Sequence, residues 1–204
     1  IMIQDIKPKK FNNHFENKKA EAGDLFLSYQ GDNVLVRAGK DELWYPAFSD
    51  FETEFPELID KARFLFNIDD TNYYLVSAKG LDSLKGWAYV TTKSFKPEEK
   101  HWRSFASTVG CQLNRWYNNN QFCGKCGKAM KHSETERMLY CGTCGFKKYP
   151  TICPCIIVAV YDGERMLLTK YAGRDYAKYA LIAGFAEIGE SLEQTVHREV
   201  REEV

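Results

Sequence analysis

The sequence lacks two features that would place the protein in a membrane or along nucleic acid. A membrane-spanning helix needs about 20 consecutive apolar residues, and no run among the 204 residues approaches that length. Lysine and arginine together number 28, as do aspartate and glutamate, so neither charge is in excess. We expect no secretory signal before the globular part, because residues 1–5 lead directly into charged sequence. We therefore expect a protein without a membrane partner.

An even set of cysteines, as in a disulfide framework, is also lacking, because the chain has seven. Four of them form two C-x2-C pairs on either side of residues 127–140. Two pairs of soft thiolates in tight turns make a closed tetrahedral zinc site with no open coordination position. We predict one structural Zn²⁺ per chain with the ligands Cys123, Cys126, Cys141 and Cys144. Reduced thiols favour a cytoplasmic location.

Alternating apolar and polar residues predict a small β-rich domain over residues 1–96. The predicted elements are a hairpin of Leu25–Tyr29 and Asn33–Arg37, an edge segment at Leu43–Pro46, a helix at Glu54–Ala62, a hairpin of Arg63–Ile68 and Asn72–Ala78, and a strand at Gly86–Thr91. We expect the aromatic residues of this domain, Trp44 among them, to lie in its core. The domain has no recognisable chemistry of its own.

A connecting amphipathic helix is predicted over residues 97–120, opening at Pro97. Its apolar residues recur at intervals of three and four from Trp102 to Tyr117. We expect this stripe to pack against the N-terminal domain or a partner subunit. Cys111 on the helix is expected to be a small core residue.

The last part of the chain predicts strands followed by a helix. Strands are expected at Ile156–Tyr161, Met166–Thr169 and Tyr179–Ala183, with Cys155 in the core, and a glycine loop follows. Ser191 and Gln194 form a capping box that opens the helix. The apolar stripe expected to face the core comprises Leu192, Val196, Val200 and Val204.

Three carboxylates stand close together on this helix. Glu199, Glu202 and Glu203 are spaced i, i+3 and i+4, so they share one side of the helix and repel one another. A divalent cation would relieve the repulsion, because hard cations take carboxylate oxygens as ligands. The alternative is a charged surface helix with Arg198–Glu202 support. We expect Glu199 and Glu203 at the edge of the apolar stripe.

These residues resemble the Nudix box, G-x5-E-x7-R-E-U-x-E-E-x-G-U, in which U is aliphatic. The matching positions are Gly184, Glu190, Arg198, Glu199, Val200, Glu202 and Glu203. We therefore expect an α+β protein with a small β-rich N-terminal domain, a four-cysteine zinc ribbon at 121–150, and the front half of a mixed α/β Nudix fold at 151–204. Gly184, Glu190 and Arg198 would have structural roles in the box.

A zinc ribbon before a Nudix box resembles the NADH pyrophosphatase subfamily. Such enzymes cleave the diphosphate of NADH or NAD to nicotinamide mononucleotide and AMP, and some remove NAD caps from RNA. The resemblance implies that Glu199, Glu203 and the Ala183 carbonyl hold catalytic Mg²⁺ or Mn²⁺. Glu202 would complete the catalytic carboxylates.

The resemblance further implies substrate contacts at Glu136, Tyr149 and Phe185. For Glu136 and Tyr149, a hairpin salt bridge and a core tyrosine are the alternatives. A substrate arginine is implied on the N-terminal side, but no motif places it. A homodimer is also implied, and the Trp102–Tyr117 stripe would offer a contact face.

Further strands, a last helix, another metal-binding glutamate and an S-Q-P-W-P-F-P signature follow the box in this subfamily. We expect this chain to be truncated before them, so activity is expected of the full-length protein rather than of this stretch alone. Two other functions stay open. One is a zinc-ribbon regulator that binds a ligand or nucleic acid, and the other is a Nudix hydrolase of another nucleoside diphosphate derivative.

Overall fold

The computed structural model describes residues 2–38, 43–92, 101–170, 172–173 and 178–204. The chain divides into two compact units, Ile1–Pro150 and Thr151–Val204. The first unit contains β1 (Phe11–Asn12), β2 (Leu25–Leu27), β3 (Tyr29–Gln30), β4 (Asn33–Ala38), β5 (Leu43–Trp44), η1 (Phe48–Asp50), α1 (Leu58–Lys61), β6 (Arg63–Ile68), β7 (Thr71–Leu75), η2 (Leu81–Ser83), β8 (Trp87–Thr91), α2 (His101–Asn119), β9 (Lys131–His132), β10 (Leu139–Tyr140) and β11 (Lys147–Lys148).

Two sheets form the N-terminal part of the first unit. One has the strand order β1-β6-β7-β2, and in the other β4 pairs with β3 and β5 along one edge and with β8 along the other. The hairpins β3–β4 and β6–β7 are present, as predicted. Leu25–Leu27 does not belong to the first hairpin, because it pairs in parallel with β7 in the other sheet. That pairing joins residues distant in sequence, so local alternation could not indicate it.

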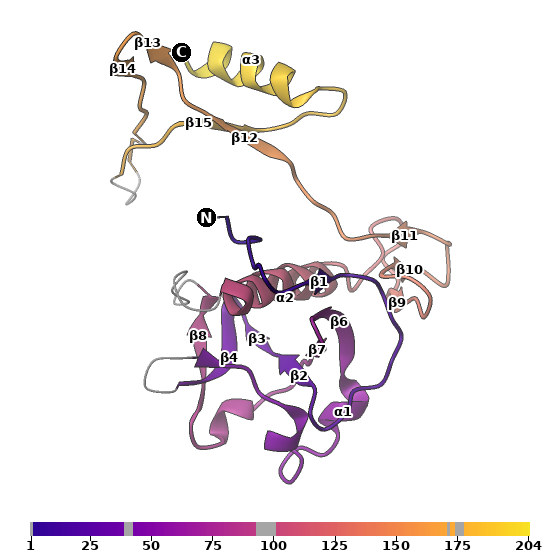
Figure 1. Ribbon diagram of the computed structural model, residues 1–204. Coiled ribbons are helices and arrows are strands. Elements are labelled where there is room, and N and C mark those ends of the chain that lie inside the picture. The colour runs from indigo at the N-terminus through magenta and orange to yellow at the C-terminus, as the bar shows by residue number, and fades with distance from the viewer. Residues whose placement is uncertain (1, 39–42, 93–100, 171, 174–177) are drawn as a thin grey trace. The chain divides into compact units, whose positions relative to one another are not determined.

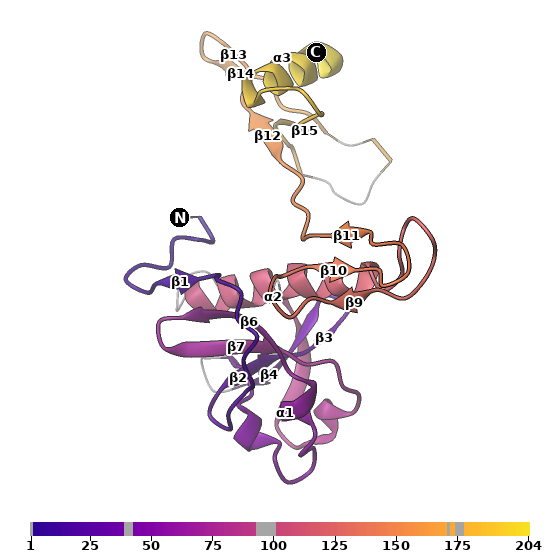
Figure 2. The same ribbon diagram turned by 90° about the vertical axis from the view of Figure 1, so that its right-hand side faces the viewer.

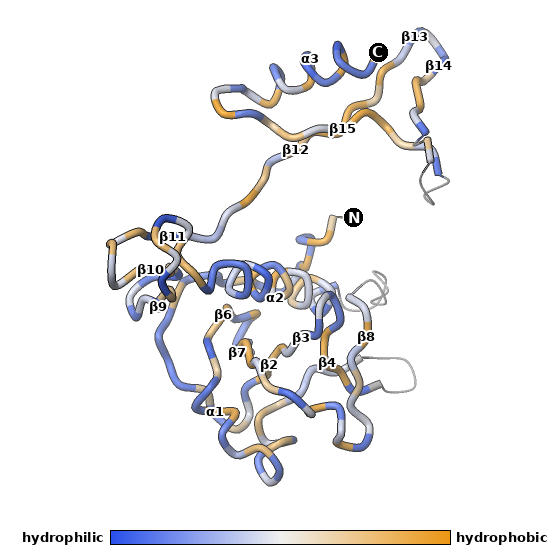
Figure 3. The backbone as a smooth tube through the Cα atoms, turned by 180° about the vertical axis from the view of Figure 1, so that it is seen from behind, coloured by the Kyte–Doolittle hydropathy of each residue, from blue (hydrophilic) through white to orange (hydrophobic). Residues whose placement is uncertain are grey.

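The period-two alternation of the strands divides their side chains between two cores. Tyr73 and Leu75 of β7 face one cluster of buried residues, and Tyr74 between them faces the other. Figure 3 colours the backbone of these strands by hydropathy. The first cluster also receives the buried face of α2.

Helix α2 lies across the sheets of the first unit (Figures 1 and 2). Its buried apolar residues belong to the same cluster as β4, β6 and β7, so the stripe packs against the N-terminal domain, as one of the two alternatives predicted. These residues are Phe105, Ala106, Leu113, Trp116 and Tyr117. Cys111 is buried, as predicted. Because the stripe is covered within its own unit, it does not offer the dimer contact face that we expected.

Three other predictions for this unit need comment. Trp44 is 49% exposed rather than part of the core. The helix expected at Glu54–Ala62 is reduced to α1, which has a single turn. The predicted opening of the long helix at Pro97 lies outside the described residues. No helix in the described part of the chain is long and apolar enough to cross a membrane.

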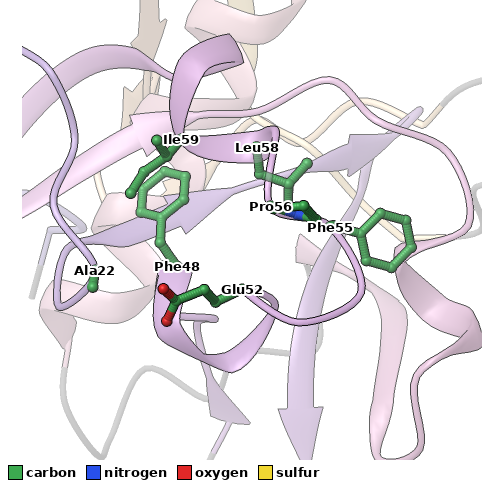
Figure 4. A pocket seen from close by; sticks show the side chains of 7 residues that line it. All are labelled: Ala22, Phe48, Glu52, Phe55, Pro56, Leu58 and Ile59. Carbon is green, nitrogen blue, oxygen red and sulfur yellow. The ribbon is translucent and has the colours of Figure 1, made fainter.

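A small apolar pocket lies between η1 and α1 (Figure 4). Phe48, Leu58 and Ile59 line it, and its volume is about 40 Å³. Glu52 is the only charged residue among those that line it. A pocket of this size, with one polar group, has room for little more than a water molecule and offers few directed contacts to a ligand.

The second unit contains β12 (Cys155–Val158), β13 (Tyr161–Asp162), β14 (Arg165–Met166), β15 (Ile182–Phe185) and α3 (Leu192–Glu203). β12 pairs with β15, β13 pairs with β14, and α3 packs on the β12–β15 pair. Each strand is displaced from or shorter than its predicted range. As a result Gly184 lies within β15 instead of opening the loop. Cys155 is exposed, so its assignment to the core is wrong.

The buried face of α3 also differs from the predicted stripe. Leu192 and Val204 are exposed, whereas Thr195 and Glu199 are the buried residues of the helix. Figure 3 shows that most of α3 is hydrophilic. The helix therefore places a carboxylate against the strands, and of the predicted stripe only Val196 and Val200 are half-buried.

At Gly110, helix α2 lies so close to the strands that there is no room for a side chain. A Cβ at this position would overlap Leu27 Cδ1 and the Tyr29 hydroxyl, which donates a 2.7 Å hydrogen bond to the Ser107 carbonyl. Glycine-to-alanine changes normally stabilise a helix interior, but here we expect Gly110→Ala to lower the free energy of unfolding by roughly 1–3 kcal/mol. Urea unfolding followed by tryptophan fluorescence measures it. Gly23→Ala is the control, because nothing lies within 4 Å of its Cβ position, and an equal loss there would contradict the argument.

Candidate functional site

The structure brings four cysteine sulfur atoms together between the strands of the ribbon. All four lie within 4.8 Å of one another. Cys123 Sγ lies 3.6 Å from Cys144 Sγ, and Cys126 Sγ lies 3.5 Å from Cys141 Sγ. A tetrahedral Zn²⁺ with bonds of about 2.3 Å places its sulfur ligands about 3.8 Å apart. The sulfur cluster therefore fits zinc, and four thiolates fill its coordination.

The two knuckles have the same backbone geometry. The Gly127 amide donates to the Cys123 carbonyl at 2.8 Å, and the Gly145 amide donates to the Cys141 carbonyl at 2.9 Å. Both glycines have positive φ, 71° and 72°, which a residue with a side chain rarely adopts. The amides of Cys144 and Thr143 lower the pKa of the Cys141 thiol to about 6. The pKa of Cys123 is also lowered, whereas hydrogen bonds with the thiols of Cys141 and Cys144 raise the pKa of Cys126.

The zinc ribbon is joined to the core of its own unit. Leu139 of β10 is buried in the cluster that α2 and the sheets form. Arg137 donates from Nη1 to Asn13 Oδ1 at 2.5 Å and from Nη2 to the Leu65 carbonyl. These contacts fix the ribbon on the N-terminal domain, so its position does not depend on the thiols alone.

In the second unit, Arg198 connects the loop before α3 to the helix. Its Nε and Nη2 donate to the two oxygens of Glu190 at 2.7 and 3.0 Å, which is a bidentate ion pair. Nη2 also donates to the Phe185 carbonyl at 2.9 Å. Glu190 accepts further bonds from the Thr195 hydroxyl and the Glu187 amide, at 3.0 and 3.1 Å. The hydrogen bonds from Arg198 are the largest cause that lowers the pKa of Glu190, to about 2.

The predicted capping box begins the helix. The Ser191 hydroxyl accepts from the Gln194 amide at 3.3 Å, and the Ser191 amide donates to the Gln194 side chain at 2.8 Å. The cap and the Glu190–Arg198 pair together fix the first two turns of α3 relative to the loop. They determine where the following carboxylates stand.

Glu199 lies against the backbone of β15. It is only 9% exposed, and a Cβ at Gly184 would overlap its carboxylate, so a larger residue there would force the Glu199 side chain to move. Arg198 Nη1 donates to Glu199 Oε1 at 2.7 Å. Within the described residues no donor is bonded to Glu199 Oε2, so this oxygen can still coordinate a cation. The carbonyl of Ala183 belongs to the peptide that leads into Gly184, which places a second oxygen on the same stretch of backbone.

The other two predicted catalytic carboxylates, Glu202 and Glu203, are exposed. Glu202 Oε2 lies 3.3 Å from Arg198 Nη1, and Glu203 follows Glu199 by one turn. Among the described residues, only the four cysteines bring three or more potential ligand atoms within 4.8 Å of one another. Glu199, Glu202 and Glu203 therefore share one side of the helix without forming such a cluster. Their hard oxygens nonetheless suit a divalent cation.

The predicted substrate residues fall in both units. In the first unit, the Tyr149 hydroxyl donates to Glu136 Oε2 at 2.8 Å, and this bond is the largest cause that raises the tyrosine pKa. Tyr149 is 49% exposed, so the alternative of a core tyrosine is wrong. Phe185 belongs to the second unit and is 64% exposed, which leaves its ring free to stack.

A groove of about 260 Å³ beside Glu136 contains basic residues that sequence reasoning missed. Arg63 and His132 line it, and the Arg63 guanidinium lies 4.7 Å from the centre of the Tyr117 ring. Burial, and then the charge of Arg63, lower the pKa of His132 to about 4. Nothing in the sequence marks Arg63, because it comes next to the ribbon only through the packing of β6 against α2 and β9.

Comparison with known proteins identifies both regions. Residues 118–146 match the family described as NADH pyrophosphatase zinc ribbon domain, and residues 152–204 match the NUDIX domain. The chain thus carries a Nudix domain behind a zinc ribbon. This combination supports the NADH pyrophosphatase subfamily of Nudix proteins.

Similar proteins include two bacterial relatives, each named NAD-capped RNA hydrolase NudC. That of Pectobacterium carotovorum is 48% identical over 94 residues, which is 46% of this chain and 36% of the relative. That of Pseudomonas fluorescens is 34% identical over 138 residues, which is 68% of this chain and 50% of the relative. The chain therefore spans half or less of the length of these relatives.

The zinc site predicts which cysteines hold metal. Cys141→Ser should remove roughly one zinc ion per chain, because three thiolates and a hydroxyl bind zinc far more weakly. Metal content after gel filtration measures the loss. Cys153→Ser is the matched control, since Cys153 is exposed and lies outside the cluster. Zinc retained by Cys141→Ser, or lost from the control, would show that the ligands are assigned wrongly.

The Glu190–Arg198 pair predicts an acid transition. NMR titration should find Glu190 near pH 2, and Arg198→Gln should return it towards the ordinary value of about 4.3. Because the folded pKa is depressed, the pair stabilises the fold above the unfolded pKa, and this stabilisation is lost as the pH falls towards 2. Arg201→Gln, an exposed cation on the same helix, should leave the titration unchanged. A normal Glu190 pKa in the unmodified protein would contradict the pairing.

Proposed function

We propose that the full-length protein hydrolyses the diphosphate of NADH and NAD to nicotinamide mononucleotide and AMP, and that it removes NAD caps from RNA. The observation that carries this proposal is the buried carboxylate of Glu199, which Arg198 holds against the backbone of Gly184, the residue that follows Ala183. A fixed carboxylate next to a carbonyl oxygen suits Mg²⁺ or Mn²⁺. The names of the relatives support the substrate class.

The chain's own residues would prepare the site for this reaction. Arg198 holds the loop through Glu190 and the helix through Glu199, so the carboxylate does not reorient when substrate arrives. Glu199, Glu203 and the Ala183 carbonyl would hold Mg²⁺ or Mn²⁺. Glu202 would accept the proton of the attacking water. A bound cation would neutralise charge on the diphosphate and lower the pKa of water. In the proposed reaction the water oxygen forms a bond to one phosphorus, the bridging P–O bond breaks, and the other nucleoside phosphate leaves with the bridging oxygen.

Substrate contacts in the first unit would come from the Glu136–Tyr149 pair. The carboxylate accepts the tyrosine hydrogen bond and keeps a second oxygen for hydroxyls of the substrate. Arg63 lines the same groove as Glu136 and is the arginine best suited to a phosphate. Phe185, exposed in the second unit, would stack on a planar ring. We also infer a cytoplasmic location from the free thiols of the ribbon.

The alternative of a regulator that only binds its ligand is less well supported. A binding domain has no need for three carboxylates at i, i+3 and i+4, because Arg198 pairs with Glu199 and Glu202 but not with Glu203, whose repulsion a bound cation would relieve. Both relatives are named as hydrolases. Hydrolysis of another nucleoside diphosphate derivative uses the same carboxylates, so only a comparison of substrates distinguishes it.

The proposed reaction is tested with the full-length protein, NADH and Mn²⁺, by following the release of AMP. Glu199→Gln keeps the shape of the side chain but removes its charge, and we expect a loss of activity of about 100-fold or more. Glu193→Gln, an exposed carboxylate in the first turn of the same helix, is the control. Zinc-loaded, folded protein that releases no AMP from NADH, while it cleaves another nucleoside diphosphate derivative, would overturn the substrate assignment.

A further inference from the structure

A second surface with binding chemistry lies on the sheet of β3, β4, β5 and β8. Arg37 of β4 pairs directly with Trp44 of β5 on one side and with Trp87 of β8 on the other. Directly opposed residues of antiparallel strands point to the same face of a sheet. An arginine therefore stands between two tryptophans in a row across three strands. Figure 1 shows β8 beside β4 in this sheet.

The same three residues line a groove of about 570 Å³. Within the described residues, Arg37 forms no ion pair and lies over no aromatic ring, and its side chain is exposed. Asp50 also lines the groove, but its carboxylate accepts a 2.9 Å bond from the Ala47 amide. The groove thus contains a guanidinium and a carboxylate that do not form an ion pair with each other.

Trp44 is held in place although half of it is exposed. The Arg103 guanidinium lies 4.1 Å from the centre of its ring, and the neighbouring Tyr45 hydroxyl donates a 2.6 Å bond to the Arg103 carbonyl. Trp87 is nearly buried and packs on Phe51, with ring centres 5.2 Å apart. The two indoles are therefore fixed, which lowers the entropy lost when a planar ligand stacks on them.

We propose that this groove binds a nucleotide, with the base against Trp44 and the phosphate on Arg37. A planar ring that carries an anion matches an exposed indole beside an unpaired guanidinium, and arginine binds phosphate through two parallel hydrogen bonds. The groove belongs to the first unit, and none of the carboxylates of α3 is among the residues that line it. A free mononucleotide and a single-stranded RNA chain share this chemistry. Only the RNA case rests on the proposed removal of caps.

The test measures binding to the chain without hydrolysis, in buffer free of Mg²⁺ and Mn²⁺. Two probes are compared, AMP by calorimetry and a fluorescent ten-nucleotide oligoadenylate by anisotropy. Trp44→Ala should weaken binding about tenfold or more, because one stacking contact is lost. Arg37→Gln should weaken it as well and should reduce the salt dependence of oligoadenylate binding by about 0.7 in the log–log slope.

Matched controls distinguish binding in the groove from the general effect of removing an aromatic ring or a positive charge. Phe122→Ala removes an aromatic residue that is 68% exposed on the ribbon, and Lys79→Ala removes an exposed cation elsewhere in the same unit. Both should bind like the unmodified chain. Binding of both probes at the groove indicates a free nucleotide, and binding of oligoadenylate alone indicates RNA. The proposal is overturned if neither probe binds, or if Trp44→Ala and Arg37→Gln bind as tightly as the controls.

The outcome is independent of the reaction assay. If the full-length protein does not cleave NADH but the groove binds AMP, the proposed function fails and the groove remains. If NADH is cleaved and neither probe binds, the proposed function stands and the proposed nucleotide site in the groove is overturned. Circular dichroism of Trp44→Ala and Arg37→Gln checks that both are folded, and Trp44→Phe, which keeps a ring, should recover much of the binding.

Discussion

The arrangement of loop, strand and helix in the second unit depends on one side chain, that of Arg198. Arg198 donates five hydrogen bonds, to Glu190, Glu199, Glu202 and the Phe185 carbonyl, and so joins strand end, loop and helix. Without it, three carboxylates within one helical turn would repel one another and the loop would lose its attachment. With it, Glu199 can lie against Gly184 as a buried charge, because the desolvation of the carboxylate is offset by an ion pair with directed hydrogen bonds. The geometry proposed for cation binding follows from this pairing.

The first unit follows a different principle, in which apolar packing positions the polar groups. Alternating strands divide their side chains between two cores, and α2 covers one of them. The ribbon is fixed on that core through Leu139, and this brings Glu136, Tyr149 and the groove of Arg63 and His132 to one region of the unit. The row of Arg37 between Trp44 and Trp87 is a further product of strand register.

Local chemistry was predictable from the sequence, and non-local packing was not. The paired knuckles and the Ser191–Gln194 box depend on residues a few positions apart, and the structure contains both. The parallel pairing of Leu25–Leu27 with β7 depends on distant segments, so alternation alone assigned that strand to the wrong partner. The valine stripe of α3 was expected to be buried, but the absence of a side chain at Gly184 admits Glu199 instead. Arg63 carries no local signal, since its neighbours in the groove come from α2 and β9.

The burial of Leu139 makes the metal site and the hydrophobic core one thermodynamic system. A ligand that binds only the folded state adds its binding free energy to the stability of whatever folds with it. Zinc closes the ribbon, the ribbon presents Leu139 to the core, and Arg137 bonds to the backbone of β6. The concentration of free zinc therefore affects the folding equilibrium of the two N-terminal sheets, although the four cysteines lie outside them. The free energy of unfolding of the β-rich domain would rise as more zinc becomes available.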